Sequence, residues 1–291
     1  MVSLIFSSRP KALAAIALIS TLTVACTSRL KEYTQITLQA ASLEAEEGAT
    51  ETSDTNAELL ESTKATVENR LAGLGVELAE VDAAEPNEIV VRVPLGVNAQ
   101  AVQSLLTSTG QLYLRNQKPD TADELAQGIA DLQRLLVEQN TLMQTGKQGE
   151  AADLQGQIDE TRETISALFE PSDLTGNKIH DARARPSDTA PGTWDVNIQF
   201  NEEGADLFAR QTKLMAGTGR AVGLFLDNVL LSTPTVDVSY AQTGITGGTA
   251  VISGNFTEEA AEELEIQLKS GALPVELEAV EIVSSDEADE E

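Results

Sequence analysis

Residues 217–236 read GTGRAVGLFLDNVLLSTPTV, and this stretch indicates the architecture of the second half of the chain. Two runs of β-forming side chains flank Asp227 and Asn228. Both of these residue types tolerate a positive φ, so the pair predicts a tight turn between two hairpin strands. A dinucleotide-binding loop needs a strand before its glycines and a helix after them. Here the order is reversed, so we interpret the glycines of GTGRAVG as the exit from a helix into a strand.

The segments around this hairpin predict a small α+β unit over residues 173–272. KIHDARAR and WDVNIQF alternate as two strands, and a turn rich in proline and glycine joins them. Residues 201–214 have a helical pattern, and TAVISG is a further strand. Thr257 is suited to cap a final helix that ends at Gly271.

An earlier α+β pattern covers residues 56–116, after a first strand and an acidic connection in residues 27–55. The pattern predicts, in order, a strand over 34–40, a helix over 56–74, strands over 76–81 and 89–93, a helix between Asn98 and Gly110, and a strand over 111–116. The order β-α-β-β-α-β is typical of a ferredoxin-like split βαβ sheet with its helices on one face.

Residues 117–172 have a different pattern, which predicts an αα-hairpin. Two apolar stripes at helical spacing are separated by GKQG, residues 146–149, and Pro171 ends the second. The hairpin is either an arm that touches a client protein or an insertion whose stripes bury only each other. We favour the insertion, because stripes at helical spacing are usually core. The stripes are Leu125, Ile129, Leu132, Leu136 and Met143, then Leu154, Ile158, Ile165 and Leu168.

Four blocks together resemble the SecD family of Sec translocase accessory subunits, in its first periplasmic domain. They are VENRLAGLGV at residues 67–76, the stretch 217–236, ITGGTAVISGNFT, and KSGALPVELEAVE. Two positions depart from the family pattern: RLKEY stands where an aspartate-leucine-x-diglycine motif is expected, and Thr249 stands where the family often has arginine. The family's later membrane helices do not follow in this sequence, so we expect no proton conduction by this chain alone.

The resemblance implies an α+β fold with a ferredoxin-like base, an inserted α+β head and a helical hairpin insertion. Residues 273–283 would return as a strand to the base, followed by an acidic, disordered tail at 284–291. The resemblance also implies that the head swings about a hinge, for which the candidates are Gly176, Ser270 and Gly271. In the family, this domain is thought to hold emerging polypeptide during protein export, with SecF as the partner of SecD.

The candidate surface for unfolded or translocating polypeptide combines the hairpin with a nearby loop. Apolar side chains and free sheet edges would bind extended chains, and the acidic surroundings would favour basic segments. The alternative is that Phe225 and Leu231 are core, since alternate strand positions face inward. A different function also stays open, that of a lipoprotein scaffold docking on a translocase without touching clients. The candidates are Phe225, Leu226, Val229, Leu230, Leu231, Tyr240 and Ile245.

Residues 1–26 have the pattern of a targeting segment. Arg9 and Lys11 precede an apolar run of 14 residues, 12–25, shorter than the roughly 20 that a spanning helix needs. The run ends in TVAC, which resembles a lipobox and predicts lipidation of Cys26. The alternative is an uncleaved signal anchor. Either form predicts a protein tethered to a membrane on the periplasmic side of a bacterial envelope.

Composition argues against several other classes of function. Lys and Arg total 19 and Asp and Glu total 47, a net charge of −28, which repels nucleic acid. His180 is the only histidine and Cys26 the only cysteine, so the chain lacks the usual ligand set of a transition metal or a catalytic triad. We therefore expect no enzyme activity and no cofactor.

Overall fold

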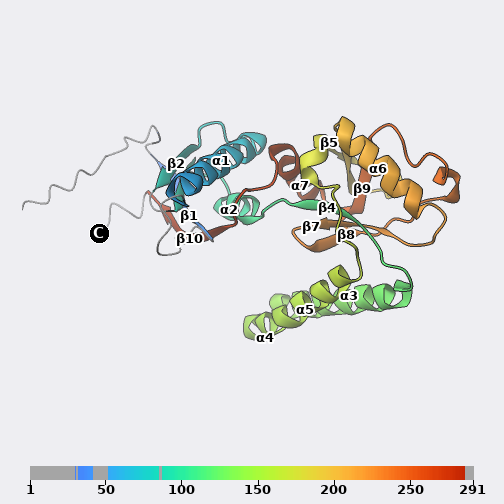
Figure 1. Ribbon diagram of the computed structural model, residues 1–291. Helices are drawn as coiled ribbons and strands as arrows, with labels where there is room; N and C mark the ends of the chain where they lie inside the picture. The colour runs from blue at the N-terminus through green and yellow to red at the C-terminus, as the bar shows by residue number, and fades with distance from the viewer. Residues whose placement is uncertain (1–29, 31, 42–51, 85–86, 286–291) are drawn as a thin grey trace, which may run out of the picture.

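The computed structural model describes residues 30, 32–41, 52–84 and 87–285, without the side chains of residues 52–55 and 255. Figure 1 shows a base at one end, a head at the other, and a helical hairpin alongside. The base contains β1 (Tyr33–Ala40), α1 (Thr52–Gly73), β2 (Glu80–Ala84), β3 (Glu88–Pro94), α2 (Ala99–Thr107) and β10 (Leu277–Ser284). The helical hairpin contains α3 (Ala122–Gln144), α4 (Gln148–Asp153) and α5 (Gln155–Ala167). The head contains β4 (Leu112–Asn116), η1 (Gly176–Lys178), β5 (Ile179–Pro186), β6 (Trp194–Phe200), α6 (Glu202–Met215), β7 (Val222–Leu226), β8 (Val229–Ser232), η2 (Val238–Tyr240), β9 (Thr249–Phe256) and α7 (Glu258–Ser270).

The base is a four-stranded antiparallel sheet in the order β10-β1-β3-β2, and α1 and α2 contribute to its core. This order is that of a ferredoxin-like fold, as the sequence predicted. Strand residues at alternate positions form the core because they share one face of the sheet. They pack against apolar side chains of the two helices, as the fully buried Ile36, Val91, Val67 and Leu106 show.

Residues 273–283 return to this sheet as β10, as the family resemblance implied. Residues 111–116, which the pattern placed in the base, do not join it: β4 pairs with β7 in the head, with Tyr113 opposite Phe225. Leu112 and Leu114 are buried in the head core. An alternating pattern predicts that a strand has one buried face, but it does not predict which sheet the strand joins. The local sequence therefore could not assign residues 111–116 to the base or to the head.

The head holds two three-stranded sheets, β4-β7-β8 and β5-β6-β9, around one core. Asp227 and Asn228 have φ values of 48° and 64°, which confirms the predicted tight turn between β7 and β8. The side chain of Asn201 caps α6 and that of Thr257 caps α7. Met215, Val196 and Ile252 from three different elements are completely buried at the centre of this core.

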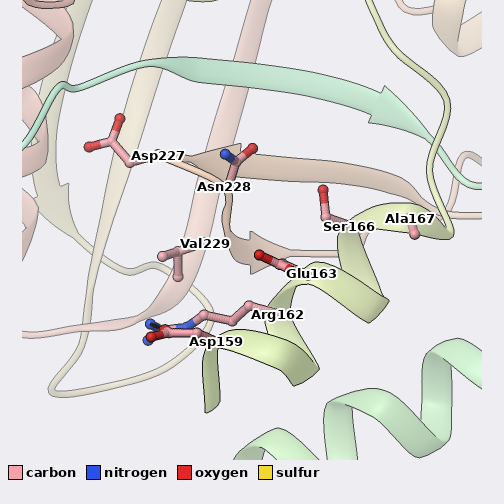
Figure 2. A pocket seen from close by; sticks show the side chains of 8 residues that line it. All are labelled: Asp159, Arg162, Glu163, Ser166, Ala167, Asp227, Asn228 and Val229. Carbon is pink, nitrogen blue, oxygen red and sulfur yellow. Dashed lines mark hydrogen bonds and ion pairs between the residues drawn. The ribbon is translucent and has the colours of Figure 1, made fainter. Parts of the chain in front are cut away.

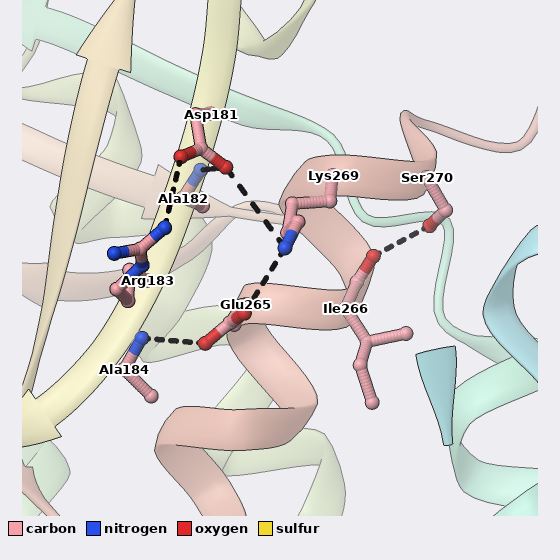
Figure 3. Close-up of polar contacts among 8 residues, drawn as sticks. All are labelled: Asp181, Ala182, Arg183, Ala184, Glu265, Ile266, Lys269 and Ser270. Carbon is pink, nitrogen blue, oxygen red and sulfur yellow. Dashed lines mark hydrogen bonds and ion pairs between the residues drawn. The ribbon is translucent and has the colours of Figure 1, made fainter. Parts of the chain in front are cut away.

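The outer edge of β5 is covered by α7. Glu265 accepts a hydrogen bond from the backbone N–H of Ala184 at 2.6 Å, and Lys269 lies between Glu265 and Asp181 (Figure 3). On the other sheet, β4 is paired along its outer side by Leu174, whose carbonyl accepts from Leu114. The remaining edge strands, β8 and β9, lie next to each other.

The helical hairpin packs on the head, so the interpretation that its stripes bury only each other is wrong. Leu125 and Ile165 form a cluster with Phe169 and with Phe225 of the head sheet. The rings of Phe169 and Phe225 meet edge to face with 4.9 Å between centroids. The distal part of the hairpin is exposed, as Met143, with 59% of its surface accessible, shows.

Residues 1–26, including Cys26 and the predicted targeting segment, lie outside the described residues, as does most of the acidic tail. Among the residues that the structure describes, no helix combines the length and the apolar character needed to cross a bilayer. The predicted lipidation therefore stays a prediction.

Candidate functional site

The candidate residues for polypeptide binding occupy very different environments. Phe225 is completely buried beneath the helical hairpin, so in this structure it belongs to the core. Tyr240 is 41% exposed in η2. The other five are half-buried. Leu226, Leu231 and Ile245 pack against the head core, Leu230 packs against the cluster under the hairpin, and Val229 lines a cleft.

Strand β8 brings several of these candidates to a sheet edge. Its only sheet neighbour among the described residues is β7, and its four residues, Val229–Ser232, are all half-buried. An edge strand presents unpaired backbone groups that an extended peptide can join. The arrangement can therefore bind polypeptide through main-chain hydrogen bonds, with half-buried apolar side chains beside them.

Two segments connect the base to the head, and we call them the links. The first link, residues 108–111, runs from α2 to β4, and the second, residues 271–276, runs from α7 to β10. They are joined where Leu273 donates to the carbonyl of Thr109 at 2.8 Å. Ser270 and Gly271 lie where the second link begins. Gly176 does not lie in a link, because it sits in the head beside Leu112.

Arg70 of α1 binds both links from the base. It is 0% exposed, and its Nη1 donates to the carbonyls of Leu105 and Ser108 at 2.7 and 2.5 Å. Its Nη2 donates to Thr109 at 3.0 Å and to Gly271 at 3.3 Å. Burial lowers the pKa of Arg70 to about 10, so the guanidinium is still charged at neutral pH.

Gly110 is required in the first link for two reasons. Its φ is +72°, a region that residues with a Cβ rarely occupy. A Cβ at this position would also lie 2.7 Å from Nη2 of Arg70, closer than atoms can approach. The sequence analysis recognised Gly110 only as the end of a helix.

Asp227, in the turn between β7 and β8, binds the same link from the head. Its carboxylate accepts from the hydroxyl of Ser108 at 2.8 Å and from the hydroxyl of Thr109. It also accepts from the backbone N–H groups of Gly110 at 3.0 Å and Gln111 at 2.7 Å. Burial alone would raise the pKa of Asp227, but these four hydrogen bonds outweigh it and lower the pKa below its usual value.

The neighbouring residue of the turn, Asn228, is connected to the helical hairpin through Arg115 of β4. Nη1 of Arg115 donates to the hydroxyl of Ser166 in α5 at 2.8 Å, and Nη2 donates to the amide oxygen of Asn228 at 3.1 Å. The guanidinium also stacks over the rings of Tyr113 and Phe225, at 4.7 and 4.8 Å from their centroids. Arg115 therefore fixes α5 to the turn.

A cleft of about 530 Å³ separates the turn from α5 (Figure 2). The side chains around it carry both signs of charge, with Arg162 paired to Asp159 at 3.2 Å. A second groove, of about 460 Å³, lies between the helices of the base and α7 of the head. Its floor includes Leu105 and Ile266, so base and head are not tightly packed there. Within the described residues, no group of three or more His, Cys, Asp or Glu side chains could hold a metal ion.

Arg70, Asp227 and Arg115 were not identified as site residues from the sequence. A signal for Arg70 was available, because it lies between Val67 and Leu71 on the apolar face of the predicted helix. A charged residue on such a face needs buried partners. Asp227 was interpreted only as a turn residue, since its contacts lie more than 100 positions away in the chain.

Comparison with known proteins identifies the family. A model described as the P1 head subdomain of SecDF matches residues 150–275. The protein translocase subunit SecD of Synechocystis sp. is 39% identical over 226 residues, covering 76% of this chain and 48% of that protein. The chain belongs to the SecD family. SecD of Prochlorococcus marinus is 30% identical over 285 residues, covering 87% of this chain and 56% of its own length.

The chain thus spans about half the length of the curated SecD relatives it matches. Solved structures agree with the fold. A crystal structure of SecDF in a super-membrane-facing form matches 87% of this SecD-family chain and 30% of its own, with a TM-score of 0.60 and 25% identity. A chain from a study of SecDF as a membrane component that enhances protein export matches with a TM-score of 0.57 and 26% identity. That match covers 86% of this chain and 99% of the other.

Proposed function

We propose that this chain acts in Sec-dependent protein export by transiently binding unfolded or translocating polypeptide along the edge strand β8. The observation that carries the proposal is the edge position of Val229–Ser232 in its sheet, where all four residues are half-buried. Main-chain pairing suits clients of unrelated sequence, because every polypeptide has the same backbone. The family membership supports a role in export, since the matched relatives are translocase subunits.

Charge adds a second contribution to client binding. The net charge of −28 attracts basic segments of exported chains at long range, and salt screens this attraction. The apolar and main-chain contacts at β8 persist at high salt. A holding surface must also release its clients, so we expect dissociation constants of about 1 μM or weaker, equivalent to about 8 kcal/mol.

A matched pair of variants tests this function. Val229→Asp places a charge at the cleft end of β8, and Val137→Asp places the same charge on the distal surface of α3, where Val137 is 67% exposed. We expect Val229→Asp to weaken binding of a labelled, permanently unfolded polypeptide about tenfold in fluorescence anisotropy, and Val137→Asp to leave it unchanged. Equal effects of the two variants, or no binding by the wild type, would reject β8 as the client site.

The same proposal includes movement of the head relative to the base, with Ser270 and Gly271 at the pivot of the second link. It also includes membrane attachment through a lipid on Cys26, and SecF or another Sec membrane subunit as the partner.

Fractionation of cells that express Cys26→Ser tests the attachment. We expect this variant in the soluble fraction, whereas an unchanged membrane fraction would argue for a signal anchor. The scaffold function replaces client binding if a Sec subunit co-purifies while no unfolded polypeptide binds.

A further inference from the structure

The two residues of the β7–β8 turn contact different parts of the molecule. Asp227 binds the first link through four hydrogen bonds, and Asn228 is bound to α5 through Arg115 and Ser166. Figure 2 shows the two side chains adjacent on the turn, with the Asp227 carboxylate directed away from α5 and the Asn228 amide on the side of Ser166. One short turn thus contacts the link directly and is connected to the helical hairpin through Arg115.

We propose that this turn couples the position of the helical hairpin to the orientation of the head relative to the base. Arg70 holds the first link from the base and Asp227 holds it from the head. Arg70 donates to backbone carbonyls of the link, and Asp227 accepts from the hydroxyl and N–H groups of the link. The orientation is fixed while both sets of bonds exist. A polypeptide or partner that displaces α5 pulls on Asn228 and Arg115, loosens the bonds of Asp227, and frees the link.

The turn can transmit a displacement because it is stiff. Both turn residues have positive φ in a two-residue connection, which leaves few alternative conformations. Phe225, two residues before the turn, is buried in contact with the ring of Phe169 and the guanidinium of Arg115. The end of the helical hairpin near Phe169, the β7–β8 turn and β4 therefore share one set of close contacts. Densely packed groups of this kind transmit strain.

Amide hydrogen exchange at Gly110 and Gln111 tests the coupling, because both N–H groups are held by Asp227. Asp227→Gly keeps the positive φ and removes the carboxylate, so it should speed their exchange by about tenfold or more. The decisive variant is Ser166→Ala in α5, which touches neither amide. Coupling predicts that it also speeds their exchange, by about threefold.

Thr164→Ala is the matched control, since Thr164 is exposed on the same helix and its hydroxyl donates only within α5, to Glu160. It should leave both amides unchanged. Asn228→Gly keeps the positive φ and removes only the amide that contacts Arg115, so it provides a second route to the same prediction. If Ser166→Ala and Asn228→Gly both behave like Thr164→Ala, the coupling is absent.

Measured distances between the base and the head complete the test. This part of the proposal rests on the movement of the head that the proposed function includes. Spin labels at Glu61→Cys in α1 and Lys213→Cys in α6, in a Cys26→Ser background, report the base–head distance in the full chain. We expect Asp227→Gly, Asn228→Gly and Ser166→Ala all to broaden the distance distribution. Broadening by Asp227→Gly alone would overturn the coupling and leave the movement intact. One narrow distance in every variant would overturn both.

Discussion

At the residue scale, the base and head are held together by a few polar side chains rather than by a continuous apolar interface. Arg70 is buried, and among the described residues no carboxylate lies within salt-bridge distance of its guanidinium. Backbone carbonyls of both links accept its hydrogen bonds instead. A buried charge is costly unless hydrogen bonds compensate for it. This cost, together with its bonds to the carbonyls of both links, makes Arg70 a determinant of the link geometry.

Arg70→Met tests this role. The change keeps most of the side-chain volume but removes the donors to both links, so we expect a loss of about 3 kcal/mol in the free energy of unfolding. Urea denaturation followed by circular dichroism measures it. Arg92→Met is the control, because Arg92 lies on the open face of the base sheet with its partner Asp82 half exposed, and it should cost about 1 kcal/mol or less. Equal losses for the two variants would contradict the role of Arg70.

The pKa of Asp227 predicts a particular dependence of stability on pH. Because hydrogen bonds lower this pKa in the folded protein, the carboxylate stabilises the fold at every pH above its unfolded value, near 4. The stabilisation is lost as pH falls through the folded pKa. Wild type should therefore exceed Asp227→Asn in stability by a constant amount from pH 7 to about pH 5, and the difference should shrink below about pH 4. A difference that stays constant down to pH 2 would contradict the assignment.

At the scale of elements, local signals predicted helices, caps and turns well, and sheet membership poorly. Asn98, Asn201 and Thr257 cap the helices they precede through bonds two or three residues away, which a sequence pattern contains. The placement of β4 in the head depends on pairing with β7, more than 100 residues later, which no local pattern contains. The return of residues 273–283 to the base was implied by the family resemblance and not by a local pattern. The hairpin stripes were identified in part: Leu125, Ile158 and Ile165 are buried, but Leu136 and Met143 are exposed, and Leu135 is buried in their place. The burial of the stripes against Phe225 depends on the fold of the head.

The root and the distal part of the helical hairpin should respond differently to truncation. Phe169→Ala removes the ring that meets Phe225 and should cost about 3 to 5 kcal/mol in unfolding free energy. Met143→Ala, at a position 59% exposed, should cost about 0.5 kcal/mol or less. An insertion whose stripes bury only each other could be deleted without loss of stability. The structure instead indicates that deletion of residues 121–170 uncovers Phe225, so the shortened protein should lose stability. Equal, small effects of Phe169→Ala and Met143→Ala would restore the earlier interpretation.

At the scale of the whole molecule, two α+β bodies are joined by two links. The helical hairpin packs on the head and is connected through Arg115 to the turn that holds the first link. The covered edges of β4 and β5 leave β8 and β9 as the sheet edges of the head, near the same turn. A client bound at β8 would therefore lie close to the residues that set the base–head orientation. Client binding at β8 and the orientation of the head relative to the base are therefore connected, because β8 begins at the turn whose residues contact the first link.

The central claim is that extended polypeptide pairs with the edge of β8, and amide hydrogen exchange of the full chain with and without an unfolded polypeptide tests it most directly. We expect the amides of Val229–Ser232 to exchange several-fold more slowly when the polypeptide is present, because pairing protects backbone N–H groups. The amides of β5, whose edge is covered by α7, should not change. Protection confined to the base sheet or to β5, with β8 unaffected at saturating polypeptide, would contradict the account.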